Sequence, residues 1–178
     1  MWSRGYGSDE SKTAFARARA LAAGVENASE RFDAYWGLFA GSLLRGELSL
    51  ARETAESFLH DAESEGRMTE ASLARRCVGQ ARLYQGDFID ARTNLAEALR
   101  TYDPERDREA RFRFGLDTGA HAAGFLALAS WALGDVQRAR TLRNEALARA
   151  DETAHGPTRA NVTTSSPSTK CSAKTLKR

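Results

Sequence analysis

The most informative part of the chain is Gly86-Asp87-Phe88-Ile89-Asp90-Ala91-Arg92, because the same pattern occurs twice more. The other copies are Gly46-Glu47-Leu48-Ser49-Leu50-Ala51-Arg52 and Gly134-Asp135-Val136-Gln137-Arg138-Ala139-Arg140. All copies share a glycine, an acidic residue, an apolar residue, two variable positions, an alanine and an arginine, and they begin 40 and 48 residues apart. Self-similarity at such spacings is typical of repeat proteins.

Each shared position has a physical role in a helical hairpin. The glycine can end one helix, because it adopts positive φ without a Cβ clash. The acidic residue favours the exposed N–H groups that begin the next helix. The apolar residue and the alanine lie on one helix face, and the small alanine allows a second helix to approach closely. A leucine follows each glycine by 13 residues and extends the buried stripe, at Leu59, Leu99 and Leu147.

The remainder of the chain is compatible with the same all-α fold. Only 3 of the 178 residues are proline, and alanine, leucine, arginine and glutamate, which favour helices, are abundant. Apolar residues recur at helical spacing. We expect helices over residues 8–23, 29–45, 47–64, 69–85, 87–102, 118–133 and 135–153, which together make one repeat domain over residues 1–155.

The repeated pattern resembles the tetratricopeptide (TPR) motif. The stretch Gly86 to Ala91 matches its Gly-Asp-aromatic-x-x-Ala turn, Ala98-Leu99 and Pro104 match its later positions, and Val78-Gly79 and Leu126-Ala127 match its first helix. The resemblance implies a TPR-like right-handed α-solenoid of antiparallel helical hairpins. The usual TPR period is 34 residues, so this chain resembles a variety with longer helices.

Residues 102–107 and 124–134 carry a more specific resemblance. They are similar to the TPR region that follows an ATPase module in large bacterial signalling proteins, many of which carry an N-terminal adenylate/guanylate cyclase domain. This resemblance covers residues 1–161 and implies a non-enzymatic protein-interaction scaffold. Its partners would be a protein, a peptide or neighbouring domains of a larger parent protein. We expect a cytoplasmic location, because the sequence shows neither a signal peptide nor a transmembrane run.

The composition changes at residue 156. Residues 156–178 hold nine serines or threonines and no acidic residue. One interpretation is a disordered basic tail. The alternative is that the gene lost one base near Val162, because shifted TCN codons for Ser165, Ser168 and Ser172 would encode apolar residues at helical spacing. In that case the chain is a truncated, frameshifted fragment without independent function.

Residues that could carry chemistry are scattered along the chain. His60, His121 and His155 are far apart, and Cys77 lies on an apolar helical stripe, which favours a buried structural thiol. The sequence contains neither a glycine-rich phosphate loop nor a Cys-x-x-Cys or His-Glu-x-x-His motif. We therefore predict no catalytic, metal-binding or cofactor-binding residues.

The candidate binding residues come from the TPR resemblance, in which the first helix of each hairpin lines a concave groove. Transferring those positions onto this chain points to Asp33, Trp36, Arg76, Gln80 and His121. Trp36 has an alternative role as a core residue. Such a groove would hold an extended or helical peptide.

Charge patterning excludes several partner classes. The formal net charge is only +2, so we expect neither nucleic-acid binding nor membrane binding. Residues 103–113 alternate acid and base, which predicts a solvated, self-compensated surface, with a binding edge as the alternative. The first and last expected helices would expose apolar faces, which predicts self-association through uncapped ends.

Overall fold

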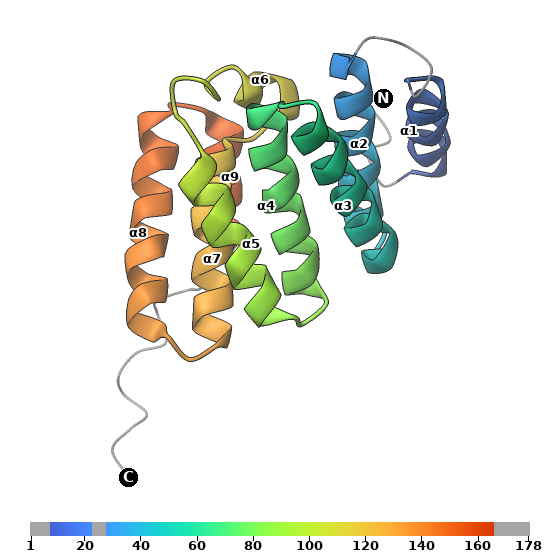
Figure 1. Cartoon of the computed structure of the whole chain (residues 1–178). Coiled ribbons are helices and arrows are strands. Elements are labelled where there is room, and N and C mark those ends of the chain that lie inside the picture. The colour runs from blue at the N-terminus through green and yellow to red at the C-terminus, as the bar shows by residue number, and fades with distance from the viewer. Residues whose placement is uncertain (1–7, 23–27, 166–178) are drawn as a thin grey trace.

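The computed structural model describes residues 8–22 and 28–165 (Figure 1). Within those ranges every regular element is an α-helix, which confirms the all-α prediction. The helices are α1 (Asp9–Ala22), α2 (Ala28–Leu44), α3 (Leu48–Ser64), α4 (Met68–Tyr84), α5 (Phe88–Thr101), α6 (Ala110–Phe114), α7 (Thr118–Ala132), α8 (Val136–Glu152) and α9 (Gly156–Ser165). Each helix expected from the sequence is present with bounds that differ by about one residue, as assignments commonly do, whereas α6 and α9 were not expected.

The glycines of the repeated pattern end helices as predicted. Gly86 has φ +85°, its N–H donates to the Leu83 carbonyl (3.1 Å), and the Asp87 N–H donates to the Arg82 carbonyl (3.0 Å). This pair of bonds is a Schellman motif, which satisfies carbonyls at a helix end. The same pair of bonds and a positive φ occur at the turns that contain Gly46, Gly66 and Gly134.

The acidic residues after these glycines behave in two ways. Asp87 and Asp135 cap the following helices by accepting the N–H groups of Asp90 (3.4 Å) and Arg138 (3.1 Å). Glu47 makes no cap hydrogen bond. Its carboxylate instead contacts Arg45 (2.9 Å) and Lys12 of α1 (2.8 Å), and these contacts lower the pKa of Glu47 to about 2.

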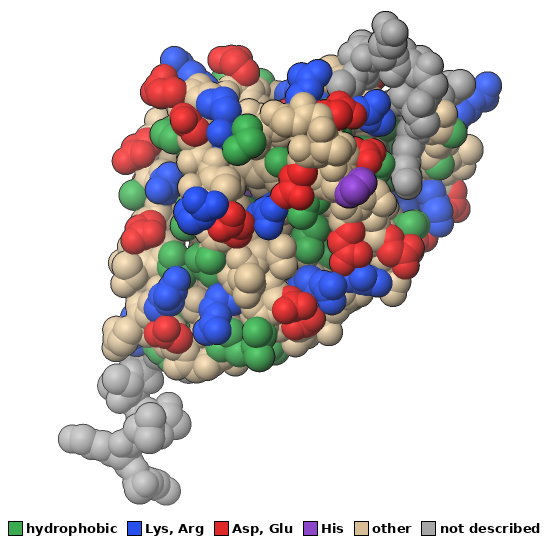
Figure 2. All heavy atoms as spheres, in the orientation of Figure 1, with side chains coloured by type: hydrophobic (Ala, Val, Ile, Leu, Met, Phe, Trp, Pro, Cys, Tyr) green, Lys and Arg blue, Asp and Glu red, His purple; other side chains and the backbone are tan. Residues whose placement is uncertain are grey.

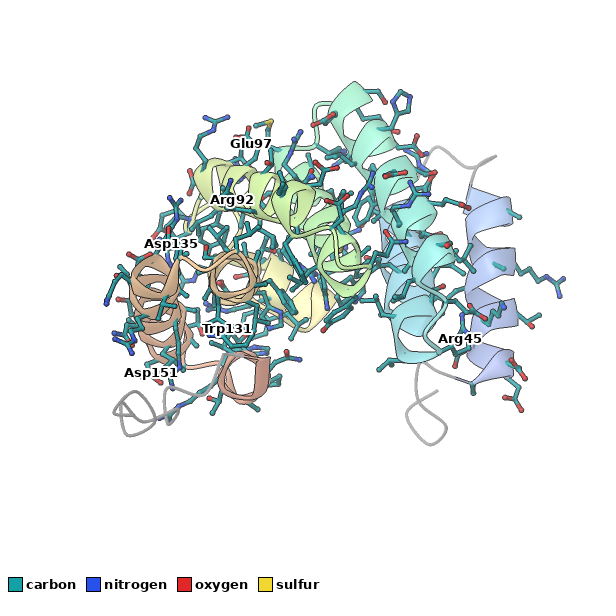
Figure 3. All side chains as sticks on the ribbon, turned by 90° about the horizontal axis from the view of Figure 1, so that it is seen from below. Arg45, Arg92, Glu97, Trp131, Asp135 and Asp151 are labelled. Carbon is teal, nitrogen blue, oxygen red and sulfur yellow. The ribbon has the colours of Figure 1, made fainter. Side chains whose placement is uncertain are left out.

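Most helices that are neighbours along the chain pack against one another. Helices α2, α4 and α7 also contact one another in that order, while α3 packs against α2 and α4, α5 against α4 and α7, and α8 against α7. Figure 3 shows α5, with Arg92 and Glu97, on one side of the stack and α9 on the other. Helix α7 contacts α4, α5, α8 and α9, which explains why most of its residues are buried.

The chain continues in helical form beyond residue 155, which differs from the expected disordered tail. Helix α9 packs against α7 and α8, and Val162 is 2% exposed among alanines of those helices. The hydroxyl of Thr158 accepts the backbone N–H of Asp117 (3.0 Å) at the start of α7. Composition averaged over residues 156–178 hid these buried positions. Residues 166–178 lie outside the described part of the chain.

The charged segment before α7 is not simply a solvated surface. Asp107 is 3% exposed and accepts hydrogen bonds from the Thr69 hydroxyl (2.6 Å) and from Arg106 (2.7 Å). Arg113 of α6 reaches back to Asp33 of α2 (2.6 Å) and Glu70 of α4 (2.9 Å). Local i, i+3 and i, i+4 spacing could not reveal Thr69, Asp33 and Glu70 as partners, because they lie far from this segment in sequence.

The outer surface of the described chain is mixed in charge. Figure 2 shows acidic and basic side chains interspersed over one face. Among the described helices, none combines the length and the apolar character needed to cross a bilayer.

Candidate functional site

A pocket of about 700 Å³ opens between the first helices of the hairpins. Helices α2, α4 and α7 form its walls, while the α6 segment and α9 line its remaining sides. Most of its lining is apolar, and the largest such side chains are Trp36, Phe39, Leu43, Leu44, Tyr84, Phe112, Phe114, Leu116 and Phe125. A concave, mostly apolar site of this size is typical of ligand-binding sites.

Four of the five predicted groove residues line this pocket, namely Trp36, Arg76, Gln80 and His121. The fifth, Asp33, is absent from the lining, and its side chain is 50% exposed and paired with Arg113. Its place in the groove could not be judged from the sequence, because its partner lies 80 residues away. Trp36 has both roles considered for it, since it also packs against the apolar core.

Arg76 is the central polar residue of the pocket. It is 1% exposed, its guanidinium lies 5.1 Å from the centre of the Trp36 ring, and its Nη1 donates to Gln80 Oε1 (2.7 Å). Within the described residues, its Nε and Nη2 have no hydrogen-bond partner. Buried charged groups are normally paired, whereas these two nitrogens of Arg76 leave their N–H donors unused beside the pocket.

His121 faces the same space from α7. It is 3% exposed, its ring meets Phe125 edge-on at 5.9 Å, and its Nε2 has no partner among the described residues. Burial, and secondarily the charge of Arg76, lower the pKa of His121 to about 3. The imidazole is therefore neutral at physiological pH.

The α6 segment supplies pocket residues that the sequence analysis missed. Phe114 packs edge-on against Trp36 (6.3 Å), and Phe112 does the same against His155 (5.8 Å). Arg111, whose Nε is buried without a hydrogen-bond partner in the described part of the chain, also lines the pocket. The alternation of arginine with phenylalanine in this segment could have indicated an amphipathic element.

The other reactive groups offer little chemistry. Cys77 is fully buried, and burial raises the pKa of its thiol to about 11. Thiolate character is what makes cysteine nucleophilic, so this thiol is unreactive. The described residues contain no cluster of three or more His, Cys, Asp or Glu side chains that could hold a metal ion.

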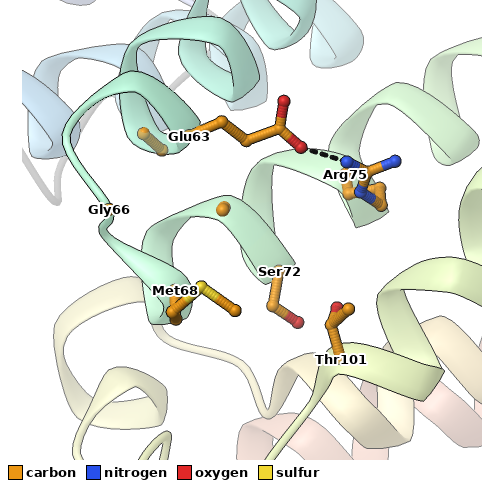
Figure 4. Close-up of a pocket in the computed structure, with 8 residues that line it drawn as sticks. Glu63, Gly66, Met68, Ser72, Arg75 and Thr101 are labelled. Atoms are coloured by element: carbon orange, nitrogen blue, oxygen red, sulfur yellow. Dashed lines mark hydrogen bonds and ion pairs between the residues drawn. The ribbon is translucent and has the colours of Figure 1, made fainter.

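A second, smaller hollow of about 130 Å³ lies between α3, α4 and α5 (Figure 4). Its charged groups are already engaged, since Glu63 pairs with Arg75. The Ser72 hydroxyl donates to the Ala98 carbonyl (3.2 Å). This hollow is small, and its polar side chains already have hydrogen-bond or ion-pair partners, so few groups remain to recognise a ligand. The larger pocket is therefore the better candidate.

Comparison of the chain with protein-family models, with curated proteins and with solved structures finds no match.

Proposed function

We propose that this chain is a non-enzymatic, TPR-like protein-interaction module whose groove between α2, α4 and α7 binds a peptide segment. On the basis of the sequence resemblance, the module would belong to a bacterial signalling protein related to nucleotide-cyclase- or ATPase-linked proteins. The observation that supports the proposal is that Trp36, Arg76, Gln80 and His121, chosen from the TPR resemblance, line one pocket.

The rim of the groove carries groups suited to a peptide. Leu44 and Tyr84 line the pocket yet are 69% and 49% exposed, so they could be covered by apolar side chains of a partner. Gln80 offers an amide for hydrogen bonding to a main chain. An apolar groove with a few convergent polar groups is the usual setting for peptide recognition in helical proteins.

The test is selection of a random-peptide phage library on the whole chain, followed by fluorescence anisotropy with the enriched peptides. We expect peptides that bind with Kd of about micromolar. Leu44→Ser should weaken their binding by about tenfold, since it removes apolar area from the interface.

Ile89→Ser is the matched control, because Ile89 is similarly exposed (62%) but lies on α5 outside the pocket. This variant should bind the peptides as the unaltered chain does. Failure to enrich any peptide, or loss of binding in Ile89→Ser but not in Leu44→Ser, would contradict the proposal.

A further inference from the structure

We propose that the depth of the pocket binds a small amphipathic carboxylate, with its anionic group on Arg76 and its apolar body between Trp36 and Phe125. The inference goes beyond peptide binding at the rim, and it can stand if no peptide is found. It concerns buried groups that a peptide lying across the rim need not reach.

The charge of the pocket requires an anion. Arg76 is buried with two unpartnered nitrogens, and Arg111 adds a third, the Nε atom. The described side chains that line the pocket include no aspartate or glutamate. Contact with the Trp36 ring compensates only part of the cost of burying a guanidinium. A carboxylate would supply the missing acceptor, because guanidinium and carboxylate match in charge and in bidentate geometry.

His121 makes the site selective rather than generally cationic. Because its imidazole is neutral, it adds no second full charge beside Arg76. Its unpartnered Nε2 can hydrogen-bond a ligand oxygen as donor or acceptor, according to its tautomer. His121 therefore adds a hydrogen-bonding group, rather than a further charge, to the site that Arg76 and Arg111 form.

The walls of the pocket specify the rest of the ligand. Trp36 and Phe39 of α2, Phe125 of α7 and Phe114 of α6 surround the space with apolar rings. A volume of about 700 Å³ is far larger than an inorganic anion needs. The ligand class is therefore a carboxylate carried on an alkyl or aryl body.

Isothermal titration calorimetry of the whole chain with four probes tests this inference. Octanoate carries an alkyl body, 4-phenylbutyrate an aryl body, 1-octanol lacks the charge, and acetate lacks the body. We expect octanoate or 4-phenylbutyrate to bind at a single site at least about tenfold more tightly than 1-octanol, because only the carboxylate satisfies Arg76. Acetate should show no measurable binding, and comparison of the two carboxylates with each other identifies the preferred body.

Arg76→Met is the decisive variant, because it keeps an apolar stem and removes the charge. It should lower carboxylate affinity to the level of 1-octanol while leaving 1-octanol binding unchanged. Arg92→Met, at an exposed position on α5, is the matched control and should bind as the unaltered chain does. Circular dichroism and thermal unfolding of both variants verify that they fold.

Several results would overturn the inference. These are equal affinity for octanoate and 1-octanol, absence of binding by both carboxylates, and retention of carboxylate preference by a folded Arg76→Met. If Arg76→Met does not fold, the comparison of octanoate with 1-octanol on the unaltered chain decides, supported by quenching of Trp36 fluorescence in a Trp2→Phe/Trp131→Phe background. Octanoate must quench Trp36 and acetate must not. The two proposals fail separately. Leu44→Ser tests peptide binding at the rim, whereas Arg76→Met tests carboxylate binding in the depth of the pocket.

Discussion

Two buried polar side chains give the pocket its character at the scale of single residues. Arg76 comes from α4 and His121 from α7, and both are almost fully buried although each has at least one unpartnered nitrogen in the described structure. Such groups destabilise a fold unless something compensates for the lost hydration. Their presence in one pocket is therefore more consistent with ligand recognition than with packing alone.

The pKa of His121 predicts how stability depends on pH. Its value of about 3 in the folded chain is below the ordinary 6.5, so the unfolded chain binds more protons between these values. The free energy of unfolding should therefore fall as the pH drops through this window, by about 2 kcal/mol from about pH 7 to about pH 5 for this group alone. His121→Gln should lose that contribution, and urea unfolding at several pH values measures the difference.

His60→Gln provides the control, since His60 is exposed on α3. Titrating groups other than the replaced histidine cancel when the two variants are compared. A His121→Gln variant with the same slope as the unaltered chain would show that His121 can be protonated in the folded state.

At the scale of elements, close approach of helices depends on small residues. A Cβ added at Gly79 of α4 would lie 2.6 Å from Leu95 Cγ and 3.2 Å from the Leu95 backbone nitrogen on α5. Gly79 belongs to the Val78-Gly79 pair that matches the TPR pattern. The structure gives this pair a physical reason, because the α4–α5 contact leaves no room for a methyl group.

Gly79→Ala should therefore destabilise the fold. Alanine in a helix interior ordinarily gains about 1 kcal/mol over glycine. Here the forced separation of α4 and α5 should outweigh that gain and leave a net loss of about 1–3 kcal/mol. Denaturant unfolding with an unchanged m-value measures the effect.

Gly124→Ala on α7 is the matched control, because the nearest atom to its added Cβ is Ala146 Cβ at 4.0 Å. This variant should be neutral or more stable by up to about 1 kcal/mol. Equal effects at the two glycines would refute the proposed role of close packing at Gly79.

At the scale of the whole molecule, the α6 segment ties distant hairpins together. Arg113 contacts Asp33 and the Ser29 carbonyl on α2, and it contacts Glu70 on α4. Phe114 packs against Trp36 on the same side of the stack. The segment thus fixes one end of the groove and supplies part of its lining.

A double-mutant cycle should detect this tie. The Glu70 side chain is only 9% exposed, so its pair with Arg113 is partly shielded from water. We expect a coupling free energy of about 1–3 kcal/mol between Arg113→Gln and Glu70→Gln. The measured quantity is the free energy of unfolding of the unaltered chain, both single variants and the double variant.

The pair of Glu97 with Arg100 on α5 is the comparison, because the Arg100 side chain is 71% exposed. Its coupling should be much smaller, because water screens an exposed ion pair. A coupling at Arg113 and Glu70 as small as this would mean that α6 adds little to the stability of the stack.

Residues close together along the chain account for the helices and their turns, because these elements depend on contacts within one or two helical turns. Gly86 and its counterparts reveal positive φ, and Asp87 and Asp135 reveal helix starts through local hydrogen bonds. The TPR resemblance also pointed to four side chains that share a pocket, together with Asp33, which is not part of its lining. The turns and caps depend on residues that are close together in the sequence, and the repeated pattern can be recognised within this one chain.

Tertiary packing sets which groups meet across long distances in the sequence. It paired Asp33 with Arg113, placed α9 against α7 and α8, and left Arg76 buried without a full set of partners. Residue type and spacing do not encode these outcomes, because each depends on how separate hairpins pack in space. The position and chemistry of the pocket therefore follow from the packing of α2, α4, α6, α7 and α9 together.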